Sequence, residues 1–405
     1  MSTSEFDSYR PPEPAGGRRK RRRGAGDRGG SGAAGARRGG WQNRGADGGR
    51  EMPMVEDVEF SSYYGRPIVK APPWGHEISL YLFLGGLAGG STLLGLGAQL
   101  TDRPGLRAAT RLTAISATAL GGAALVADLG RPERFLNMMR TVKVTSPMSL
   151  GTWILSGFGV GAGVTAAIEV DRLTGQRLLP LGPLRRPLHA LETTAAVESA
   201  LFATPLAAYT AVLLGATAVP TWNAAGRNGL PYVFVSSAAM ASGGTAMALA
   251  PVRETGPARL LAVAGAAGDL VAMQGMKKRM HPAEVEPLES GEPGHKLHRS
   301  EKLLIAGALG TAAVEVGARF LSTKLAKGAE SVSGGRRWKT KTVLRAVSAI
   351  SGVALAAASA YTRFGVLEAG IESTKDPRHV VEPQKARLEE RRARGITDDS
   401  ITTGR

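Results

Sequence analysis

The 405-residue sequence predicts an all-α integral membrane protein in which eight transmembrane helices lie between two disordered tails. The first observation is a series of eight apolar windows, most of them close to the roughly 20 residues that cross a bilayer. The second is the glycine content of 54 residues, much of it inside these windows, where small residues let membrane helices approach closely. The third is the contrast between these windows and the mean hydropathy of the whole chain, which is only -0.06 because very polar tails offset the apolar windows.

The apolar windows define the predicted domain organisation. They cover approximately residues 76–100, 106–127, 148–170, 188–219, 232–250, 258–273, 303–321 and 343–367. A basic Gly- and Arg-rich tail, residues 1–57, precedes the membrane domain, residues 58–370, and a charged tail, residues 371–405, follows it. The first tail has too few large apolar residues to offset its ordering entropy, so we expect disorder. Its Arg- and Gly-rich composition permits binding to nucleic acid, but we prefer a solvated tail that is attracted to anionic lipid headgroups.

Eight spans put both tails and every even-numbered loop on one side of the membrane, here called face X; the opposite side is face Y. The loops on face Y carry more Lys and Arg than those on face X, which by the positive-inside rule favours a cytoplasmic face Y. The Arg-rich N-terminal tail on face X favours the reverse. The membrane orientation therefore stays open.

The chain contains no cysteine, so it cannot form a disulfide or hold a thiolate-ligated iron–sulfur cluster. Among its histidines only His76 and His189 lie near predicted spans, and they enter the membrane from opposite faces. We therefore expect no haem, and no zinc or copper site. Any redox metal in this system would belong to a partner.

The entrance of the first predicted helix carries the groups that a quinone site needs. The segment PPWGHEISLYLF places His76, Glu77 and Tyr81 at face X. A quinone headgroup requires hydrogen-bond donors at its carbonyls and a proton acceptor nearby, and a histidine beside an acid supplies both. An interfacial histidine that only hydrogen-bonds its own loop is the alternative, and both interpretations stay open here.

Two further segments reach face X: DLGRPERF at the end of the second predicted helix and TSPMSLGTW at the start of the third. Their polar residues are Asp128, Arg131, Glu133, Arg134, Ser146 and Ser149. We predict that these residues order the loop and dock a partner. A helix-end ion pair around Pro132 would account for part of the same pattern.

Three carboxylates lie near the middle of apolar windows, where each charge costs about 2.5 to 3.5 kcal/mol on insertion scales. Arg319 follows Glu315 by one helical turn, which predicts a structural ion pair. Glu198 and Asp269 have no local partner and are candidates for a proton relay. Polar cross-links between helices are the alternative for both.

The motifs PPWGHEISLYLFLGGLAGGS, DLGRPERFLNMMR and TSPMSLGTW resemble the NrfD/PsrC family, the membrane anchor subunits of polysulfide-reductase-like molybdoenzymes. The upstream segment FSSYYGRPIVKAP is similar to the actinobacterial branch, and the resemblance covers roughly residues 58–370. It implies two four-helix bundles without haem, beside a four-cluster iron–sulfur subunit and a molybdopterin catalytic subunit. It also implies exchange of electrons with membrane quinone, menaquinone or ubiquinone, near His76.

The sequence thus predicts a multi-pass protein of the cell membrane that exchanges electrons between a partner iron–sulfur subunit and quinone or quinol. The chain itself would be a non-catalytic or quinone-reactive subunit of a molybdopterin oxidoreductase complex. A proton-coupled secondary transporter that uses intramembrane carboxylates is the alternative. A transporter should show broken helices with paired polar groups at the midplane, whereas the motif residues here gather at one surface.

Overall fold

The computed structural model describes residues 67–129, 131–326 and 334–396, and every regular element within these ranges is a helix. Among the described residues, seven helices are long and apolar enough to cross a membrane, which confirms the all-α, multi-pass prediction. They are α1 (His76–Leu100), α2 (Pro104–Asp128), α3 (Pro147–Leu173), α5 (Glu192–Gly215), α7 (Leu230–Leu249), α8 (Gly256–Arg279) and the Thr342–Ser373 part of α11 (Gly334–Ser373). The predicted disordered N-terminal tail, residues 1–57, lies outside the described residues.

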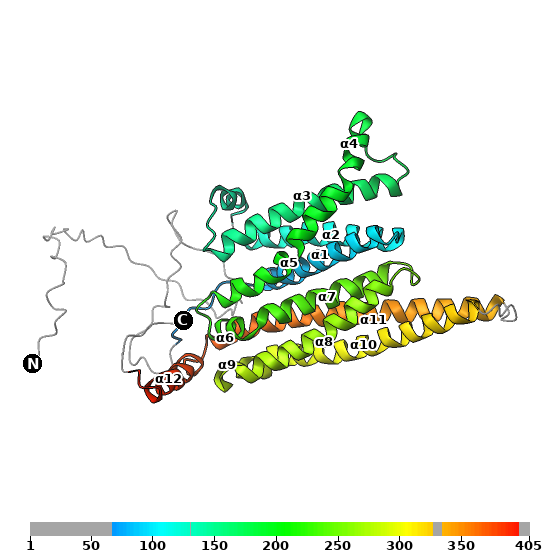
Figure 1. The fold of residues 1–405 in the computed structure, drawn as a ribbon. Helices are drawn as coiled ribbons and strands as arrows, with labels where there is room; N and C mark the ends of the chain where they lie inside the picture. The colour runs from blue at the N-terminus through cyan, green and yellow to red at the C-terminus, as the bar shows by residue number, and fades with distance from the viewer. Residues whose placement is uncertain (1–66, 130, 327–333, 397–405) are drawn as a thin grey trace, which may run out of the picture. The chain divides into compact units, whose positions relative to one another are not determined.

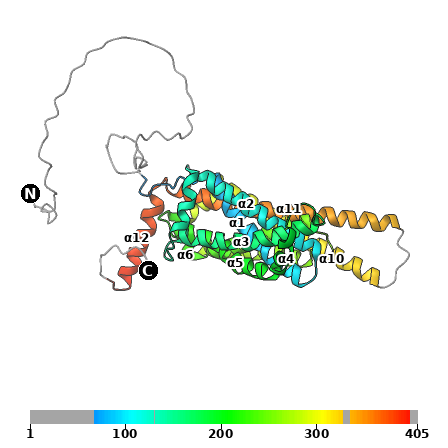
Figure 2. The ribbon, with the colours of Figure 1, turned by 90° about the horizontal axis from the view of Figure 1, so that it is seen from above.

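The remaining predicted span, residues 303–321, lies within α10 (Gly291–Ala326), which is not among the seven. Glu315 and Arg319 lie in its apolar stretch, and the side chains of residues 320–326 lie outside the described part of the structure. α10 is still one continuous helix of 36 residues packed along α11. Figure 2 shows these two helices extending beyond the others at face Y. By length and composition, the structure thus identifies seven of the eight predicted spans.

Short helices lie at the ends of the long ones (Figure 1). Those on face X are η2 (Pro132–Arg140), α6 (Pro220–Asn228), α9 (Pro282–Glu289) and α12 (Arg378–Ala393); those on face Y are η3 (Gly182–Leu184) and α4 (Arg185–Ala190). The prediction of a disordered C-terminal tail is wrong for residues 378–393, which form α12. Ion pairs from Arg378 to Glu286 and from Arg387 to Glu284 hold α12 against α9.

α1 is the most enclosed of the seven spans, since 83% of its apolar window is buried. It contacts α2, α5, α7 and α11. Glycines permit this close packing: a Cβ built on Gly89 would lie 2.6 Å from the carbonyl oxygen of Ala203 in α5. Similarly, a Cβ built on Gly244 of α7 would lie 2.5 Å from the carbonyl oxygen of Gly352 in α11. The small residues inside the apolar windows therefore set the spacing of the helices.

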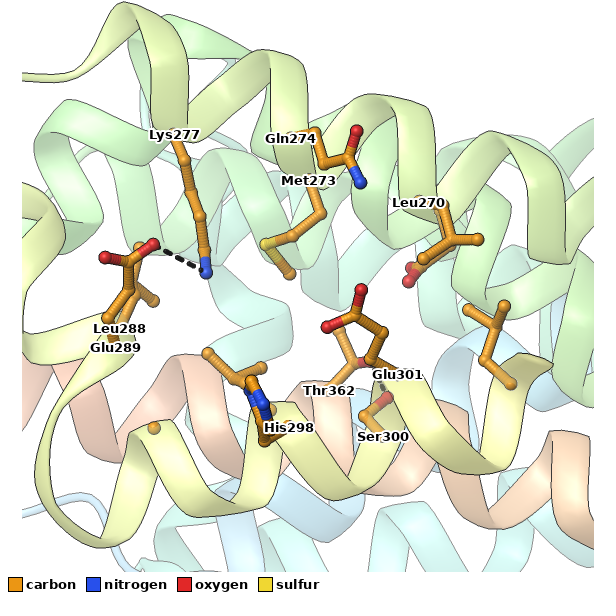
Figure 3. Close-up of a pocket in the computed structure, with 14 residues that line it drawn as sticks. Leu270, Met273, Gln274, Lys277, Leu288, Glu289, His298, Ser300, Glu301 and Thr362 are labelled. Atoms are coloured by element: carbon orange, nitrogen blue, oxygen red, sulfur yellow. Dashed lines mark hydrogen bonds and ion pairs between the residues drawn. The ribbon is translucent and has the colours of Figure 1, made fainter. Parts of the chain in front are cut away.

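A cavity of about 380 Å³ lies between α8 and α10, on the side of face X (Figure 3). Its walls come from the C-terminal half of α8, the N-terminal part of α10, the end of α9 and one residue of α11. The lining combines leucine side chains with charged groups. The second half of the protein therefore contains a polar space that reaches into a spanning segment.

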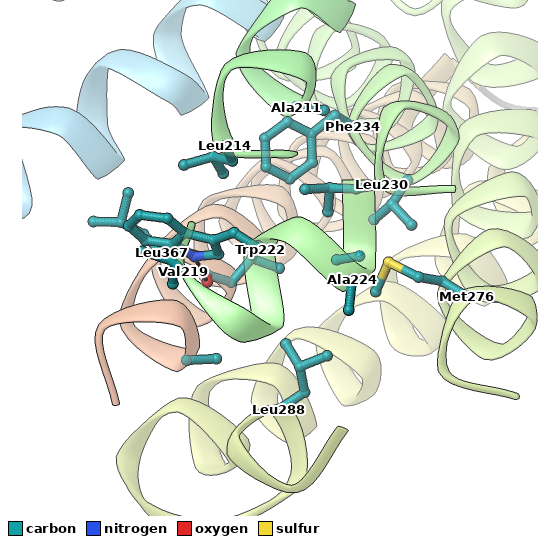
Figure 4. Close-up of a cluster of buried hydrophobic side chains, with 14 of the residues drawn as sticks. Ala211, Leu214, Val219, Trp222, Ala224, Leu230, Phe234, Met276, Leu288 and Leu367 are labelled. Carbon is teal, nitrogen blue, oxygen red and sulfur yellow. Dashed lines mark hydrogen bonds between the residues drawn. The ribbon is translucent and has the colours of Figure 1, made fainter. Parts of the chain in front are cut away.

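A buried apolar cluster around Trp222 of α6 closes the face X ends of the helices (Figure 4). The Trp222 indole Nε1 donates to the Val366 carbonyl oxygen of α11 at 2.8 Å. The Trp222 ring stacks on Trp74, with 5.3 Å between the ring centroids. Because Trp74 lies two residues before α1, this stack holds the entrance of α1 against α6 and α11.

Candidate functional site

The entrance of α1 brings together side chains from three helices. His76, the first residue of α1, has a side chain that is 79% exposed, and its Nδ1 lies 3.9 Å from Glu368 Oε1 of α11. Its ring stacks on that of Phe364, with 6.0 Å between centroids. Lys296 of α10 donates to both carboxylate oxygens of Glu368, at 2.6 Å for Oε2. The acid beside His76 is therefore Glu368, while Glu77, the predicted acid, has an exposed side chain.

Tyr81 lies deeper in α1, and its buried hydroxyl hydrogen-bonds to the Tyr209 hydroxyl of α5. Tyr81 is thus engaged with α5 rather than with the cluster at the helix entrance. Ser79, three residues after His76, is fully buried, and its Oγ has no hydrogen-bond partner among the described residues. Sequence reasoning missed Tyr209 and Ser79, because neither side chain is unusual in a membrane helix.

The second motif turns from α2 into η2 at face X. Asp128, the last residue of α2, is half-buried and close enough to Glu77 for their charges to repel each other. Arg131 and Glu133 have exposed side chains at the start of η2, and the side chain of Arg134 lies outside the described part of the structure. The exposed pair is accessible at face X, and its docking role stays a prediction.

The third motif forms the start of α3 and the loop before it. Ser146 is the N-cap of α3, and its Oγ accepts a hydrogen bond of 3.5 Å from the Ser149 backbone N–H. The Ser149 Oγ donates to the Thr141 carbonyl oxygen and accepts from the Lys143 backbone N–H, both at 3.0 Å. These bonds fix the loop between η2 and α3. Both serine side chains therefore hydrogen-bond to the backbone of this loop and of the first turn of α3. A direct contact with a partner stays a prediction.

The two predicted relay carboxylates lie inside spanning helices. Glu198 of α5 is half-buried against Gly161 of α3, and Asp269 of α8 is only 4% exposed. Glu198 Oε2 and Asp269 Oδ1 are both buried without a hydrogen-bond partner among the described residues. An ionised carboxylate in such a place loses its hydration without replacement. Both groups are therefore candidates for taking up and releasing a proton.

Arg363 of α11 is a fully buried cation that sequence reasoning missed. Its Nη2 donates to the Phe234 carbonyl oxygen of α7 at 2.5 Å, and its guanidinium carbon lies 3.6 Å from the centroid of the Phe234 ring. Its Nε and Nη1 have no hydrogen-bond partner among the described residues, and its charge interacts with that of Asp269. The sequence feature that could have identified Arg363 is an arginine inside the apolar window 343–367, because charged residues in membrane spans are rare and usually functional.

Glu315 joins two helices. Its Oε1 lies 2.7 Å from Arg319 Nε, one turn along α10, and its Oε2 accepts from Arg259 Nε of α8 at 2.6 Å. Sequence reasoning missed Arg259, which is only 8% exposed at the start of its window. The carboxylate is therefore shared between two cations, and the contact from α8 makes it a cross-link between helices.

A second network cross-links α2, α3 and α5 towards face Y. Arg111 Nη1 donates to Glu169 Oε2 at 3.0 Å and to Glu192 Oε1 at 2.7 Å. Arg107 pairs with Glu169, and Arg172 pairs with Glu192. Because these buried charges satisfy one another, the network stabilises helix packing rather than offering a binding site. Its signal in the sequence was a set of charges inside and beside the apolar windows.

The geometry defines an integral membrane subunit with long apolar helices, buried ionic cross-links and polar motifs gathered at face X. The model of the family described as polysulphide reductase, NrfD, matches residues 68–265, from the entrance of α1 into α8. This chain belongs to the NrfD polysulphide reductase family of membrane subunits. Membership implies that it is the membrane anchor of a multi-subunit oxidoreductase and assembles with partner subunits.

The match confirms the resemblance seen in the three face X motifs, all of which lie within the matched residues. It does not support the narrower assignment to an actinobacterial branch. No curated protein matches the chain. Asp269, Glu315 and Arg363 lie beyond the matched residues, so the family match assigns them no role.

Proposed function

We propose that the chain is the quinone-reactive membrane anchor of a molybdopterin oxidoreductase complex. It exchanges electrons between a partner subunit with four iron–sulfur clusters and membrane quinone or quinol, and a molybdopterin subunit carries the catalysis. The family match supports this class of complex. The lack of cysteine leaves every thiolate-ligated cluster to the partners. The observation that carries the proposal is the cluster of His76, Glu368 and Lys296 at face X.

The residues of this cluster fit a quinone headgroup. Menaquinone or ubiquinone, when bound, supplies a carrier that takes up electrons together with protons. With the quinone bound, His76 would donate a hydrogen bond to a headgroup carbonyl and would exchange protons at its imidazole. Glu368 places a carboxylate beside the imidazole, Lys296 binds that carboxylate, and Phe364 offers an apolar face beside the ring. The high exposure of His76 fits a site that a partner subunit completes at face X.

We propose that α10 is the eighth span and that the eight spans form two four-helix bundles. The first bundle consists of α1, α2, α3 and α5, and the second of α7, α8, α10 and α11. The ionic network that joins α2, α3 and α5 supports the first grouping. Extensive packing of α7 on α8 and of α10 on α11 supports the second. With eight spans, both tails lie on face X.

The other predicted residues take three roles in this proposal. Asp128, Arg131, Glu133, Arg134, Ser146 and Ser149 shape the surface on which the iron–sulfur subunit docks. Glu198 and Asp269 exchange protons inside the membrane, which their unpartnered carboxylate oxygens support. Glu315 and Arg319 form a structural ion pair, supported by the additional contact with Arg259.

The transporter alternative is less well supported. Transporters of the inverted-repeat kind bind their substrate where helices break near the midplane. Each of the seven described spans and α10 is a single continuous helix. The continuity of these helices favours an anchor that works at its surface.

The substitution His76→Ala tests the proposed function in the complex purified with its partners. We expect loss of quinone-linked turnover, because the headgroup loses its hydrogen-bond donor, with normal assembly and normal partner activity towards soluble dyes. His295→Ala is the matched control, since His295 is also exposed at the start of α10 on face X. Normal quinone-linked rates in the His76 variant would remove the assignment.

A further inference from the structure

The cavity between α8 and α10 ends at a buried acid. Asp269 and Leu270 of α8 line its deep part, and Asp269 lies eight residues before Lys277, roughly 12 Å along the helix. Asp269 is 4% exposed, and its Oδ1 has no hydrogen-bond partner among the described residues. A polar atom at the wall of a roomy cavity is where buried water binds. The cavity thus connects an unpartnered carboxylate to a space large enough for several waters.

Charged and titratable groups follow the cavity from its opening inwards. Lys277 Nζ and Glu289 Oε1 lie 3.2 Å apart and join α8 to α9 across the outer part. His298 and Glu301 of α10 line the middle, and Figure 3 shows Glu301 reaching towards α8. Polar groups thus continue from the face X surface towards the interior.

The helices behind the cavity supply one further charge. Arg363 of α11 is fully buried and interacts electrostatically with Asp269. The hydroxyls of Ser300 and Thr362, also in the lining, hydrogen-bond to each other at 2.8 Å. α7, which packs on the other side of α8, has no charged residue in its sequence. Arg363, the residue after Thr362 in α11, thus places a buried positive charge beside the lining of the cavity.

We propose that this cavity is a water-filled entrance through which protons pass from face X to Asp269, and that the Lys277–Glu289 pair closes it. The inference rests on the proton-exchange role proposed above for Asp269. Along the path, His298 and Glu301 each accept and release a proton, and Asp269 takes the proton up at its unpartnered oxygen. The half-exposed Lys277–Glu289 pair is a weak contact that can open and reform.

The absence of cysteine from the chain permits a direct test of water access. Leu270 lines the cavity, whereas its neighbour Val271 is 73% exposed on the outer side of α8, which faces lipid in a spanning helix. In membranes containing the whole complex, Leu270→Cys should react with a charged, membrane-impermeant methanethiosulfonate added at face X. Val271→Cys should react at least about tenfold more slowly, because the thiolate forms in water and not in hydrocarbon.

Two further measurements separate the entrance from a closed cavity. Glu289→Gln should raise the labelling rate of Leu270→Cys by removing the closing pair. Complete labelling should then block the cavity and lower quinone-linked turnover severalfold, while partner activity towards soluble dyes is retained. Equal reactivity at Leu270→Cys and Val271→Cys, or full labelling without any loss of turnover, would overturn the proposal.

A failure of the proposed proton entrance can be distinguished from a failure of the proposed quinone function. If the unmodified complex shows no quinone-linked turnover, the quinone assignment fails. The labelling rates still decide whether water reaches the cavity, because they do not depend on turnover. Conversely, an unreactive Leu270→Cys in a complex with normal quinone-linked turnover would contradict the proposed proton entrance and leave the proposed quinone function intact.

Discussion

Buried charges in this protein differ in whether their neighbours satisfy them. Glu315 contacts two arginines, and its pairing with Arg319 could be predicted from a spacing of one helical turn. Asp269 and Arg363 keep atoms without partners among the described residues. The contact of His76 with Glu368 could not be predicted from the sequence. The two residues lie in the first and the last spanning helix of the chain, and their contact depends on how α1 and α11 pack.

The substitution Glu315→Gln tests the structural side of this distinction. Removing the charge leaves Arg259 nearly buried without its carboxylate, so we expect a loss of about 3 kcal/mol or more in unfolding free energy. Arg319→Gln should cost less than about 1 kcal/mol, because the Arg319 side chain is mostly exposed. Thermal unfolding of the purified complex measures both. Equal losses in the two variants would contradict the cross-link with Arg259.

Arg363 and Asp269 should be energetically coupled. Arg363→Gln removes a buried cation whose charge acts on Asp269, and Asp269→Asn removes the anion whose charge acts on the guanidinium, so each variant should be destabilised. The double variant should be more stable than the sum of the single effects predicts, with a coupling of about 0.5 to 3 kcal/mol. A double-mutant cycle on unfolding in detergent measures this coupling. Strict additivity would mean that the two charges do not interact.

At the scale of helices, apolar windows predicted the long elements well and the short ones not at all. The first window and α1 have the same limits, because hydrophobicity and helix ends coincide at the membrane surface. The window 188–219 spans α4 and α5, since an apolar stretch does not show where a helix turns. α6, α9 and α12 are not apolar enough to form windows. Contacts with the long helices hold α6 and α9 in place, whereas α12 packs on α9 and α6.

The packing of α7 against α11 depends on glycine at the contact. Gly244→Ala would put a Cβ 2.5 Å from the Gly352 carbonyl oxygen, so the helices would have to separate. We expect a loss of about 1 to 3 kcal/mol, typical of overpacking. Gly122→Ala in α2 is the control, because a Cβ there meets nothing within 4 Å and should be neutral or slightly stabilising. Detergent-resistance assays on the two variants compare them directly.

The number of spans decides how the whole molecule lies in the membrane. If α10 crosses it, the segment before α1 and the segment after α11 lie on the same side. Cysteines at the exposed positions Ala71 and Lys375 should then be labelled from one side, and a cysteine at Asp102 from the other. Labelling of intact cells and inverted vesicles with an impermeant reagent reads this out. Labelling of Lys375→Cys together with Asp102→Cys would leave α10 outside the membrane.

The central position of α1 has a consequence for how the protein is made. α1 is synthesised before the other spans, yet α5, α7 and α11, which cover it, follow much later in the chain. During synthesis, part of its glycine-rich surface is exposed to lipid, with which it packs poorly, until α11 has been inserted. Biogenesis should therefore depend on an insertase or chaperone that shelters α1. Truncated chains that end before α11 should be cleared by membrane proteases.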